Sequence, residues 1–351
     1  MLSVRADLIG IDPYVSPQLP ARRRMNTNES PYAPPESVSA ALAEELTGLS
    51  LNRYPDRDAA DLVGALAARW GRPPGGIWVA NGSNEVFMHL FLAFGGPGRT
   101  ALTFEPTYSL HSLIPRLALT DVDHVARNGD FDLELETAVD HIVVHRPEVV
   151  VVCSPNNPTG GIVPLEAIDT LCRRTAGLVV VDEAYGEFAG DGASALPLLE
   201  EHDNLAIVRT FSKAWRLAGV RLGYMLAAPE IVERMSVVRL PYHLSAPSQA
   251  VGVAALNAEA EMQGAVERIV SERERVSTSL AALGMSVVSS RANFVLFAPS
   301  DADGVWQSLY DAGVLVRSYP GSEALAGYLR VTIGTPEDND DFLEVLAGVV
   351  R

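Results

Sequence analysis

The chain has 351 residues, of which 44 are Asp or Glu and 27 are Lys or Arg, and its formal net charge is −17. An acidic surface repels nucleic-acid phosphates and anionic lipid, so neither nucleic acid nor a membrane surface is an expected partner. The length suits one large domain with a smaller one. Residues 1–24 contain no apolar signal core, and no segment approaches about eighteen unbroken apolar residues, which favours a cytoplasmic protein.

Proline is frequent in residues 12–37, "DPYVSPQLPARRRMNTNESPYAPPES". Proline lacks a backbone donor and disfavours helix in the residue before it, so this segment is expected to be an extended arm. We divide the chain into an arm of residues 1–35, a large domain of residues 36–244 and a small C-terminal domain of residues 245–351.

Short runs of consecutive apolar residues alternate with helical patterns through the large domain. Such runs are typical of strands covered on both faces, as in a mostly parallel sheet packed between helices. The expected fold class is therefore α/β. The runs are "IWVA" (77–80), "TALTF" (100–104), "EVVVVCS" (148–154), "GLVVVDEAY" (177–185) and "LAIVRTF" (205–211).

The first of these runs leads into a Gly-Ser-Asn turn and a helical pattern, "WVANGSNEVFMHLF". Free backbone N–H groups at the start of that helix, with the Ser83 hydroxyl and the Asn84 amide, would bind an anion. An ordinary helix cap is the alternative.

No metal site is expected. His141 and His145 stand four residues apart, but the intervening "IVV" favours a strand, on which this spacing is poor for a shared ion. Cys153 and Cys172 are too far apart for a CxxC unit, and burial is the simpler interpretation of both. Nucleotide-binding and zinc-protease motifs are also missing.

Polar residues follow the next runs, at the strand ends where open α/β sheets bind ligands. Asn157 lies in the turn "CSPNNPTGG", which could equally be a turn without chemistry. Asp182 follows an apolar run directly, where an unpaired carboxylate is costly, so a cationic partner is expected.

The stretch "RTFSKAWRLAGVRLGY", residues 209–224, places Ser212, Lys213 and Arg221 after the last run of a chain with few lysines. A lysine amine forms a Schiff base with an aldehyde, and a carboxylate keeps a ring nitrogen protonated so that the ring accepts carbanion charge. With an anion cradle for phosphate, these residues indicate pyridoxal 5′-phosphate. A solvated surface lysine is the alternative.

After residue 244 a pattern rich in Ala, Glu and Arg predicts one long, possibly bent helix over 245–283. The remainder predicts short strands separated by helices, a small α+β domain. These strands lie in "MSVVSSRANFVLFAPS" (285–300), "GVLVRSY" (313–319) and "GYLRVTIGT" (327–335).

The order Asn-Pro-Thr-Gly, Asp-Glu-Ala-Tyr, Ser-Lys-Ala and a late "YLRVTIGT" resembles the fold-type I aminotransferases over nearly the whole chain. Within them, "RMNTNESPY", "ANGSNE", "PTYSLH", "VRLPYHLS" and "ANFVLF" are similar to the histidinol-phosphate aminotransferases. The resemblance implies amino transfer between L-histidinol phosphate and 2-oxoglutarate, giving imidazole-acetol phosphate and glutamate in histidine biosynthesis. An aromatic amino-acid aminotransferase on the same scaffold is the alternative.

The resemblance also assigns roles to residues. It implies that Lys213 carries the cofactor and moves the Cα proton, and that Asp182 pairs with the ring nitrogen. Asn157 and Tyr185 would bind the cofactor's phenolic oxygen, and Tyr108 would stack on its ring. The residues implied around the phosphate are Ser83, Asn84, Thr210, Ser212 and Arg221.

Tyr54 resembles the tyrosine that such dimers extend into the neighbouring subunit's phosphate site, which implies a homodimer with shared active sites. Arg330 matches the arginine that binds the acidic end of the substrate, and Arg317 is expected as a second. Asn28 and Tyr14 are expected to close over the pocket from the arm.

Three positions depart from the family pattern: Ser30 replaces an Asn of the arm motif, and Trp215 and Arg216 follow the lysine where smaller or apolar residues are commoner. These departures affect the assignment of the substrate, because none of these positions is implied in binding the cofactor.

Overall fold

A computed structural model describes residues 4–11, 18–50 and 52–350 of the chain. A central sheet has seven strands in the order β2-β8-β7-β6-β5-β3-β4. Strand β8 runs antiparallel to β2 and β7, and the other neighbours in the sheet are parallel. The expected α/β class is confirmed. The strands are β2 (Ile77–Ala80), β3 (Thr100–Glu105), β4 (Asp121–Ala126), β5 (Val149–Cys153), β6 (Leu178–Asp182), β7 (Leu205–Thr210) and β8 (Gly223–Ala227).

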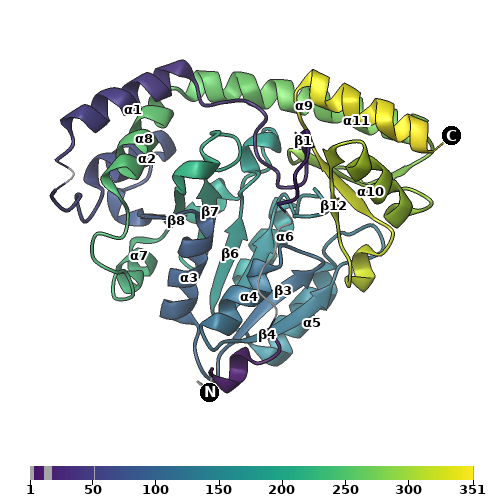
Figure 1. The fold of residues 1–351 in the computed structure, drawn as a ribbon. Helices are drawn as coiled ribbons and strands as arrows, with labels where there is room; N and C mark the ends of the chain where they lie inside the picture. Colours follow the sequence, from purple (N-terminus) through teal and green to yellow (C-terminus); the bar gives the residue numbers. More distant parts are fainter. Residues whose placement is uncertain (1–3, 12–17, 51, 351) are drawn as a thin grey trace.

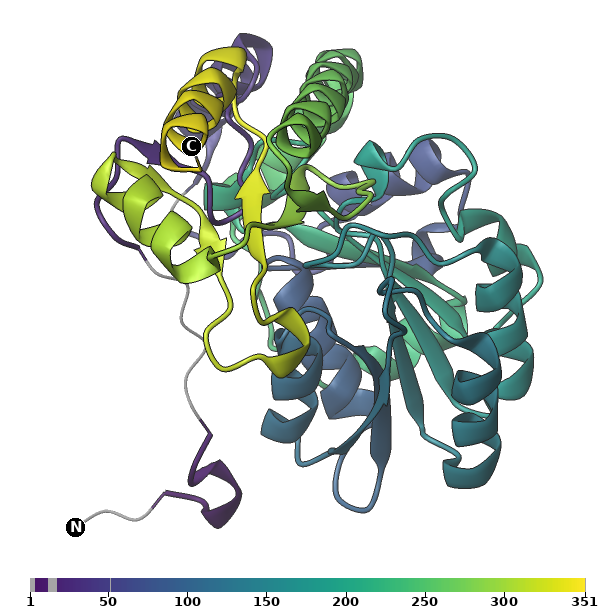
Figure 2. The ribbon, with the colours of Figure 1, turned by 90° about the vertical axis from the view of Figure 1, so that its right-hand side faces the viewer.

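Helices cover both faces of this sheet (Figure 2). Every residue of β5, β6 and β7 is buried, because each face of these strands meets an apolar helix face. One core lies under α2 (Ala60–Trp70), α5 (Leu135–His145) and α6 (Leu165–Arg174). The other lies under α3 (Ser83–Phe94), α4 (Leu110–Leu117) and α7 (Pro229–Met235).

One expectation about secondary structure was wrong, and a second is made more specific. The residues around His141 and His145 form the end of α5 and not a strand, because α5 buries Ala138 and Ile142 on one face at helical spacing. The single long helix expected over 245–283 is divided at Ala258 into α8 (Ala246–Asn257) and α9 (Glu259–Ala282). The two halves have different partners, since α8 packs on α1 (Glu36–Gly48) and α2 whereas α9 packs on α11 (Pro336–Val349). Figure 1 shows α9 and α11 side by side.

A second, antiparallel sheet has the order β12-β13-β10-β9 and forms the C-terminal part of the molecule with α10 (Ala302–Asp311) and α11. Its strands are β9 (Ser286–Val287), β10 (Phe294–Ala298), β12 (Arg317–Ser318) and β13 (Leu329–Thr332). Strand β1 (Arg23–Arg24) pairs in parallel with β11 (Val314–Leu315), so the end of the arm is bound to this C-terminal part. The 3₁₀ helices are Ala6–Leu8, Pro74–Gly76, Gly186–Phe188, Leu196–Glu200, Ala218–Val220 and Glu323–Leu325.

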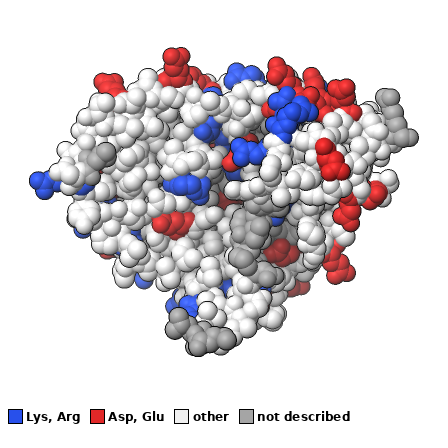
Figure 3. Space-filling view, viewed as in Figure 1, with Lys and Arg blue, Asp and Glu red and all other residues white. Residues whose placement is uncertain are grey.

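Charged side chains are distributed over the surface, and Figure 3 shows acidic ones gathered along the edge where α9 and α11 lie. Some of these carboxylates hold the arm, because Arg23 contacts Asp338 at 2.6 Å and Asp341 at 2.7 Å. In the described part of the chain, no helix combines the length and the apolar character needed to cross a membrane.

Candidate active site

A cavity of about 590 Å³ opens between the carboxyl edge of the central sheet, the arm and the C-terminal sheet. It brings together nearly all of the residues that the sequence nominated. Those that line it are Asn28, Ser83, Asn84, Tyr108, Asn157, Asp182, Tyr185, Thr210, Ser212, Lys213, Arg221, Arg317 and Arg330.

Lys213 lies just after β7 and is the only lysine in the chain. Its Nζ donates to the backbone oxygen of Thr27 at 3.1 Å and lies 5.9 Å from the centre of the Tyr185 ring. Burial lowers the pKa of the Lys213 ammonium to about 8, and the nearby charge of Arg330 acts in the same direction. The expected alternative of a solvated surface lysine is therefore wrong, and a larger fraction of the amine is neutral near pH 7 than in an ordinary lysine.

Asp182 ends β6 and is buried. Its Oδ1 accepts from the backbone N–H of Ala184 at 3.0 Å, and its Oδ2 lies 2.8 Å from Nε2 of His111 on α4. The expected cationic partner is replaced here by an imidazole, which lies within hydrogen-bond distance of the carboxylate. Sequence reasoning missed His111, although it stands three residues after Tyr108 and so lies on the same side of the turn into α4.

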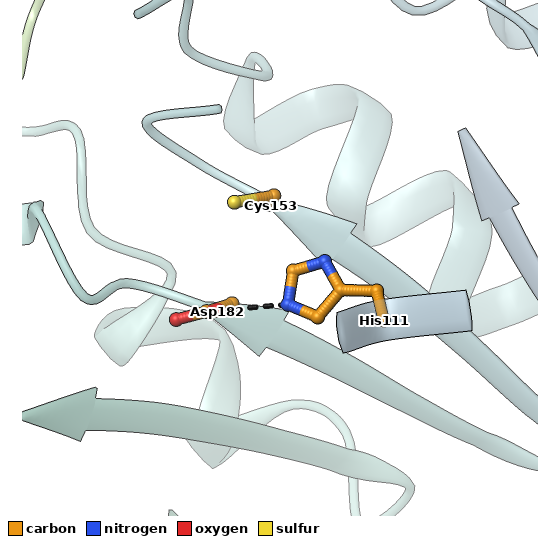
Figure 4. Close-up of side chains that lie close together, drawn as sticks. All are labelled: His111, Cys153 and Asp182. Carbon is orange, nitrogen blue, oxygen red and sulfur yellow. Dashed lines mark hydrogen bonds and ion pairs between the residues drawn. The ribbon is translucent and has the colours of Figure 1, made fainter. Parts of the chain in front are cut away.

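Cys153 joins His111 and Asp182 in a buried cluster at the ends of β5 and β6 (Figure 4). Burial raises the pKa of the Cys153 thiol far above its ordinary value, so the sulfur stays protonated. Because metals bind the thiolate and this thiol is protonated, the chemistry of these three groups does not favour an ion.

Tyr185 presents its hydroxyl to two amides. It accepts from Nδ2 of Asn28 at 2.9 Å and lies 3.4 Å from Nδ2 of Asn157. Burial raises the pKa of this hydroxyl. Asn28 is itself fixed, because it has φ of 56° and bonds Thr332 through both its backbone N–H and its side-chain oxygen. The arm residue expected to close over the pocket is therefore part of its wall.

The start of α3 forms an anion cradle. The residue before the helix is Gly82, with φ of +85°, so no side chain caps the free N–H groups at the start of α3. A Cβ on Gly82 would lie 2.6 Å from Nη2 of Arg221, which shows how closely the guanidinium approaches. Arg221 also donates to Ser212 Oγ at 3.3 Å, and Thr210 lies 3.0 Å from the same oxygen. A helix N-terminus, a guanidinium and hydroxyls together suit a phosphate group.

Two arginines from the C-terminal sheet face the same cavity. Arg317 on β12 pairs in register with Arg330 on β13. Arg330 donates from Nη1 to Oδ1 of Asn157 at 2.5 Å and from Nη2 to the backbone oxygen of Asn26 at 2.7 Å. This arrangement concentrates positive charge at the side of the cavity opposite the central sheet and suits an anionic substrate.

The sequence analysis did not predict another part of the cavity wall. Glu105, Ser112 and His124 line it. Oε1 of Glu105 accepts from Ser112 at 2.9 Å and lies 3.7 Å from Nδ1 of His124. These residues come from β3, α4 and β4, and β4 was not expected as a strand.

Some nominated residues lie elsewhere. Tyr54 is 79% exposed, does not line the cavity, and stacks on Tyr242 with 4.4 Å between ring centroids. Tyr14 lies outside the described residues. Trp215 is buried in the core against Phe211, at 5.2 Å between ring centroids, and is not part of the cavity wall.

The other two departures from the family pattern also lie away from the cavity wall. Arg216 donates to the backbone oxygens of Ala33 and Glu261, and Ser30 lies on the arm. Neither of them, nor Trp215, therefore alters the shape of the pocket directly.

Comparison with known proteins agrees with this geometry. The family model of class I and II aminotransferases matches residues 24–346. Histidinol-phosphate aminotransferases from Corynebacterium glutamicum and Thermobifida fusca are 43% and 46% identical, over 100% and 98% of this chain and 97% and 95% of their own lengths. A crystal structure of histidinol-phosphate aminotransferase from Sinorhizobium meliloti in complex with pyridoxal-5′-phosphate has a TM-score of 0.91 at 25% identity, covering 100% of this chain and 98% of that one. The chain belongs to the class I and II aminotransferase family.

Proposed function

We propose that this enzyme uses pyridoxal 5′-phosphate to exchange an amino group between L-histidinol phosphate and 2-oxoglutarate, giving imidazole-acetol phosphate and glutamate. The observation that carries the proposal is a single cavity holding a partly buried lysine, a buried carboxylate, an anion cradle and two arginines. Full-length relatives named histidinol-phosphate aminotransferase support the substrate. They do not favour the aromatic amino-acid alternative.

The residues of the cavity fit the cofactor. Arg221, Ser212 and the start of α3 would hold its phosphate, and Asp182 would hold a proton on its ring nitrogen. Bound there, pyridoxal phosphate supplies an aldehyde that takes up the amino group and a ring that accepts the electrons released at Cα. Tyr185, with Asn157 beside it, would bind the phenolic oxygen. Tyr108 also lines the cavity, where its side chain could stack on the cofactor's ring.

Lys213 moves the proton. A pKa of about 8 raises the neutral fraction of its Nζ at pH 7 by roughly two orders of magnitude relative to an ordinary lysine. The neutral amine would hold the cofactor through its aldehyde and, when the substrate amine takes that place, would move a proton between the substrate Cα and the carbon of the cofactor's aldehyde group. His111 and the Ala184 N–H position the two oxygens of Asp182 at the end of β6.

Arg330 and Arg317 recognise the acidic end of each substrate. Glutamate presents carboxylates and histidinol phosphate presents a phosphate, and a guanidinium binds either anion through paired donors. Arg330 is oriented by Asn157 and Asn26, so it meets both substrates from one position. Arg317 lies opposite Arg330 on the neighbouring strand. It would contribute more to the binding of the doubly charged phosphate than to the binding of glutamate.

We further propose a homodimer in which Tyr54 reaches the partner's phosphate site. Tyr54, Tyr242, Val237 and Leu240 are all exposed, Val237 by 86% and Leu240 by 71%, and such apolar exposure favours a protein interface. Mixing Tyr54→Phe chains with Lys213→Ala chains tests it, because a hybrid dimer would contain one intact pocket. Activity equal to the weighted sum of the two separate variants would oppose sharing. The two free, buried cysteines suit the cytoplasmic location included in this proposal.

The reaction is tested by single-turnover measurements on the cofactor-loaded enzyme with histidinol phosphate, phenylalanine, tyrosine and glutamate, following the visible band of the bound cofactor. We expect the highest kcat/KM with histidinol phosphate. A higher value with phenylalanine or tyrosine would transfer the assignment to an aromatic aminotransferase. Borohydride reduction followed by mass spectrometry should place the cofactor on Lys213, the only lysine side chain available.

A further inference from the structure

A second group of metal-ligating side chains lies outside the cavity, between the edge strand β4 and helix α5. Asp123 projects from β4, and His141 and His145 from the last turns of α5. None of the three lines the cavity. Nε2 of His141 lies 3.0 Å from Oδ2 of Asp123, and Nδ1 of His145 lies 3.9 Å from the same oxygen.

The helical conformation of α5 is what brings the two imidazoles together. Residues four apart lie on one face of a helix, one turn above the other. The rings of His141 and His145 are stacked, with centroids 4.1 Å apart and an interplanar angle of 17°. The two side chains therefore lie next to each other on one face of α5, and one ring must turn about its χ2 bond for both lone pairs to meet at one ion.

The spacing of the ligand atoms suits a tetrahedral ion. Two ligand atoms bound to tetrahedral zinc at ~2.0–2.1 Å lie roughly 3.3 Å apart, and the separations of 3.0 and 3.9 Å fall on either side of this value. We propose that Asp123, His141 and His145 bind a divalent transition-metal ion of the zinc, cobalt or nickel type. Imidazole with one carboxylate selects these ions over magnesium or calcium, which prefer oxygen ligands.

The surroundings leave the fourth coordination position of the ion open to water, and their negative charge favours a bound cation. The side chain of His145 is 51% exposed and that of Asp123 35%, so the ion has access from solvent. The C-terminal end of α5 carries a partial negative charge, and the chain as a whole has a net charge of −17. Arg146, which ends the helix, is the nearest opposing charge along the chain.

Another surface cluster serves as a comparison. Asp169, Glu201 and His202 also lie close together, but they offer one imidazole in place of two. Nitrogen ligands bind zinc-type ions more tightly than carboxylates alone, so His202 is a suitable control position. A variant there changes an imidazole that is 9% exposed and paired with Asp169 at 2.7 Å, and it leaves the proposed site intact.

The experiment titrates untagged, cofactor-loaded enzyme, stripped with a chelator and desalted, with Zn²⁺ alone in a calorimeter. Wild type and His202→Gln should each bind one ion per chain at this site with the same affinity. His145→Gln should weaken that binding at least tenfold, and Asp123→Asn should weaken it less, because both imidazoles remain. Aminotransferase activity of His145→Gln should equal that of wild type, which confirms that the variant folds.

Cobalt gives an independent readout. Co²⁺ in the wild type should produce the intense visible bands of a tetrahedral site, measured as a difference spectrum against the metal-free holoenzyme, and His141→Gln should abolish them. The proposal fails if Zn²⁺ binding is equal in wild type and His145→Gln. It also fails if wild type takes up no ion at sub-millimolar concentration, or if His202→Gln loses binding and His145→Gln does not.

Discussion

Two walls of the active-site cavity are built in different ways. The cofactor wall, comprising Asp182, Lys213, Arg221 and the start of α3, comes from strand ends of one sheet, where β6, β7 and β8 are direct neighbours. The substrate wall, comprising Arg317, Arg330 and Asn28, comes from the C-terminal sheet and the arm. Hydrogen bonds connect it to the residues proposed for the cofactor's phenolic oxygen, from Arg330 to Asn157 and from Asn28 to Tyr185.

This difference separates the residues that carry out the reaction from the residues that select the substrate. Changes in the cofactor wall act on groups fixed by a buried sheet, so they should remove catalysis without moving the wall itself. Changes in the substrate wall act on contacts between segments far apart in sequence, so they should alter which acid is bound and how tightly. The following predictions test that division, in order of decreasing effect.

The largest effect is expected from Asp182→Asn. An amide cannot keep the ring nitrogen protonated, so the electron-accepting capacity of the cofactor falls. We expect kcat to fall at least about a thousandfold, or ~4 kcal/mol, for every substrate, while the cofactor stays bound through the phosphate cradle. Stopped-flow kinetics and the visible spectrum measure the two quantities. Turnover within tenfold of wild type would remove Asp182 from its proposed role.

The cofactor wall could be predicted from the sequence because its residues directly follow the runs that make the sheet. Asp182 follows three buried valines, and Lys213 lies three residues after the end of β7. Burial of those runs necessarily brings the following residues to one edge. The nomination of Arg330 and Arg317, by contrast, depended on family resemblance, since no periodicity links them to residues of the arm.

Other features could not be predicted, for physical reasons. Strand β4, "DVDHVA", lies at the sheet edge and is largely solvated, so it lacks an apolar run. In α5, Val143 and Val144 have β propensity but are exposed, and packing of the opposite helix face decides the conformation. The partnership of His111 with Asp182 depends on how α4 packs against β6, which local sequence does not specify.

The second prediction concerns the protonation of Lys213. Because burial lowers its pKa to about 8, labelling of the cofactor-free protein by an amine-reactive reagent should rise as pH rises through about 8. An ordinary lysine placed by Arg174→Lys at the exposed C-terminal end of α6 should respond near ~10.4 and react roughly a hundredfold more slowly at pH 7. Mass spectrometry separates the labelled peptides. Equal midpoints for the two lysines would contradict the lowered pKa.

The third prediction compares the two arginines of the substrate wall. Arg330→Ala removes charge-assisted hydrogen bonds worth ~1.5–3 kcal/mol, so kcat/KM should fall roughly 10- to 100-fold in both half-reactions. Arg317→Ala should reduce the reaction with histidinol phosphate more than that with glutamate. Arg330→Lys is the matched control, which keeps the charge but loses the planar fork. Equal losses from Arg317→Ala in both half-reactions would contradict the assignment of this residue to the phosphate.

The fourth prediction concerns His111, which acts through Asp182 and so belongs to the cofactor wall. His111→Leu leaves Oδ2 of the carboxylate without its 2.8 Å partner. We expect kcat to fall about tenfold with all substrates and KM to change little, since a hydrogen bond to a charged group is worth ~1.5 kcal/mol or more. The pH profile of the cofactor's visible band should shift as well. A loss confined to Tm, with kcat and the pH profile unchanged, would make His111 a packing residue only.

The smallest effect is expected at Trp215, which departs from the family pattern beside the lysine and yet lies in neither wall. Its ring is 2% exposed, contacts Phe211, and lies 5.3 Å from the guanidinium carbon of Arg69. Among the described residues its Nε1 has no hydrogen-bond partner, so Trp215→Phe removes ring volume without leaving a new unpaired acceptor. We expect a stability loss of about 1–2 kcal/mol in denaturant unfolding, from the cavity created. The ratio of kcat/KM for histidinol phosphate to that for phenylalanine should stay within about twofold of wild type, well under ~1 kcal/mol. A marked gain for phenylalanine in this variant would show that the core behind Lys213 shapes the substrate wall, and the division between the two walls would fail at this residue.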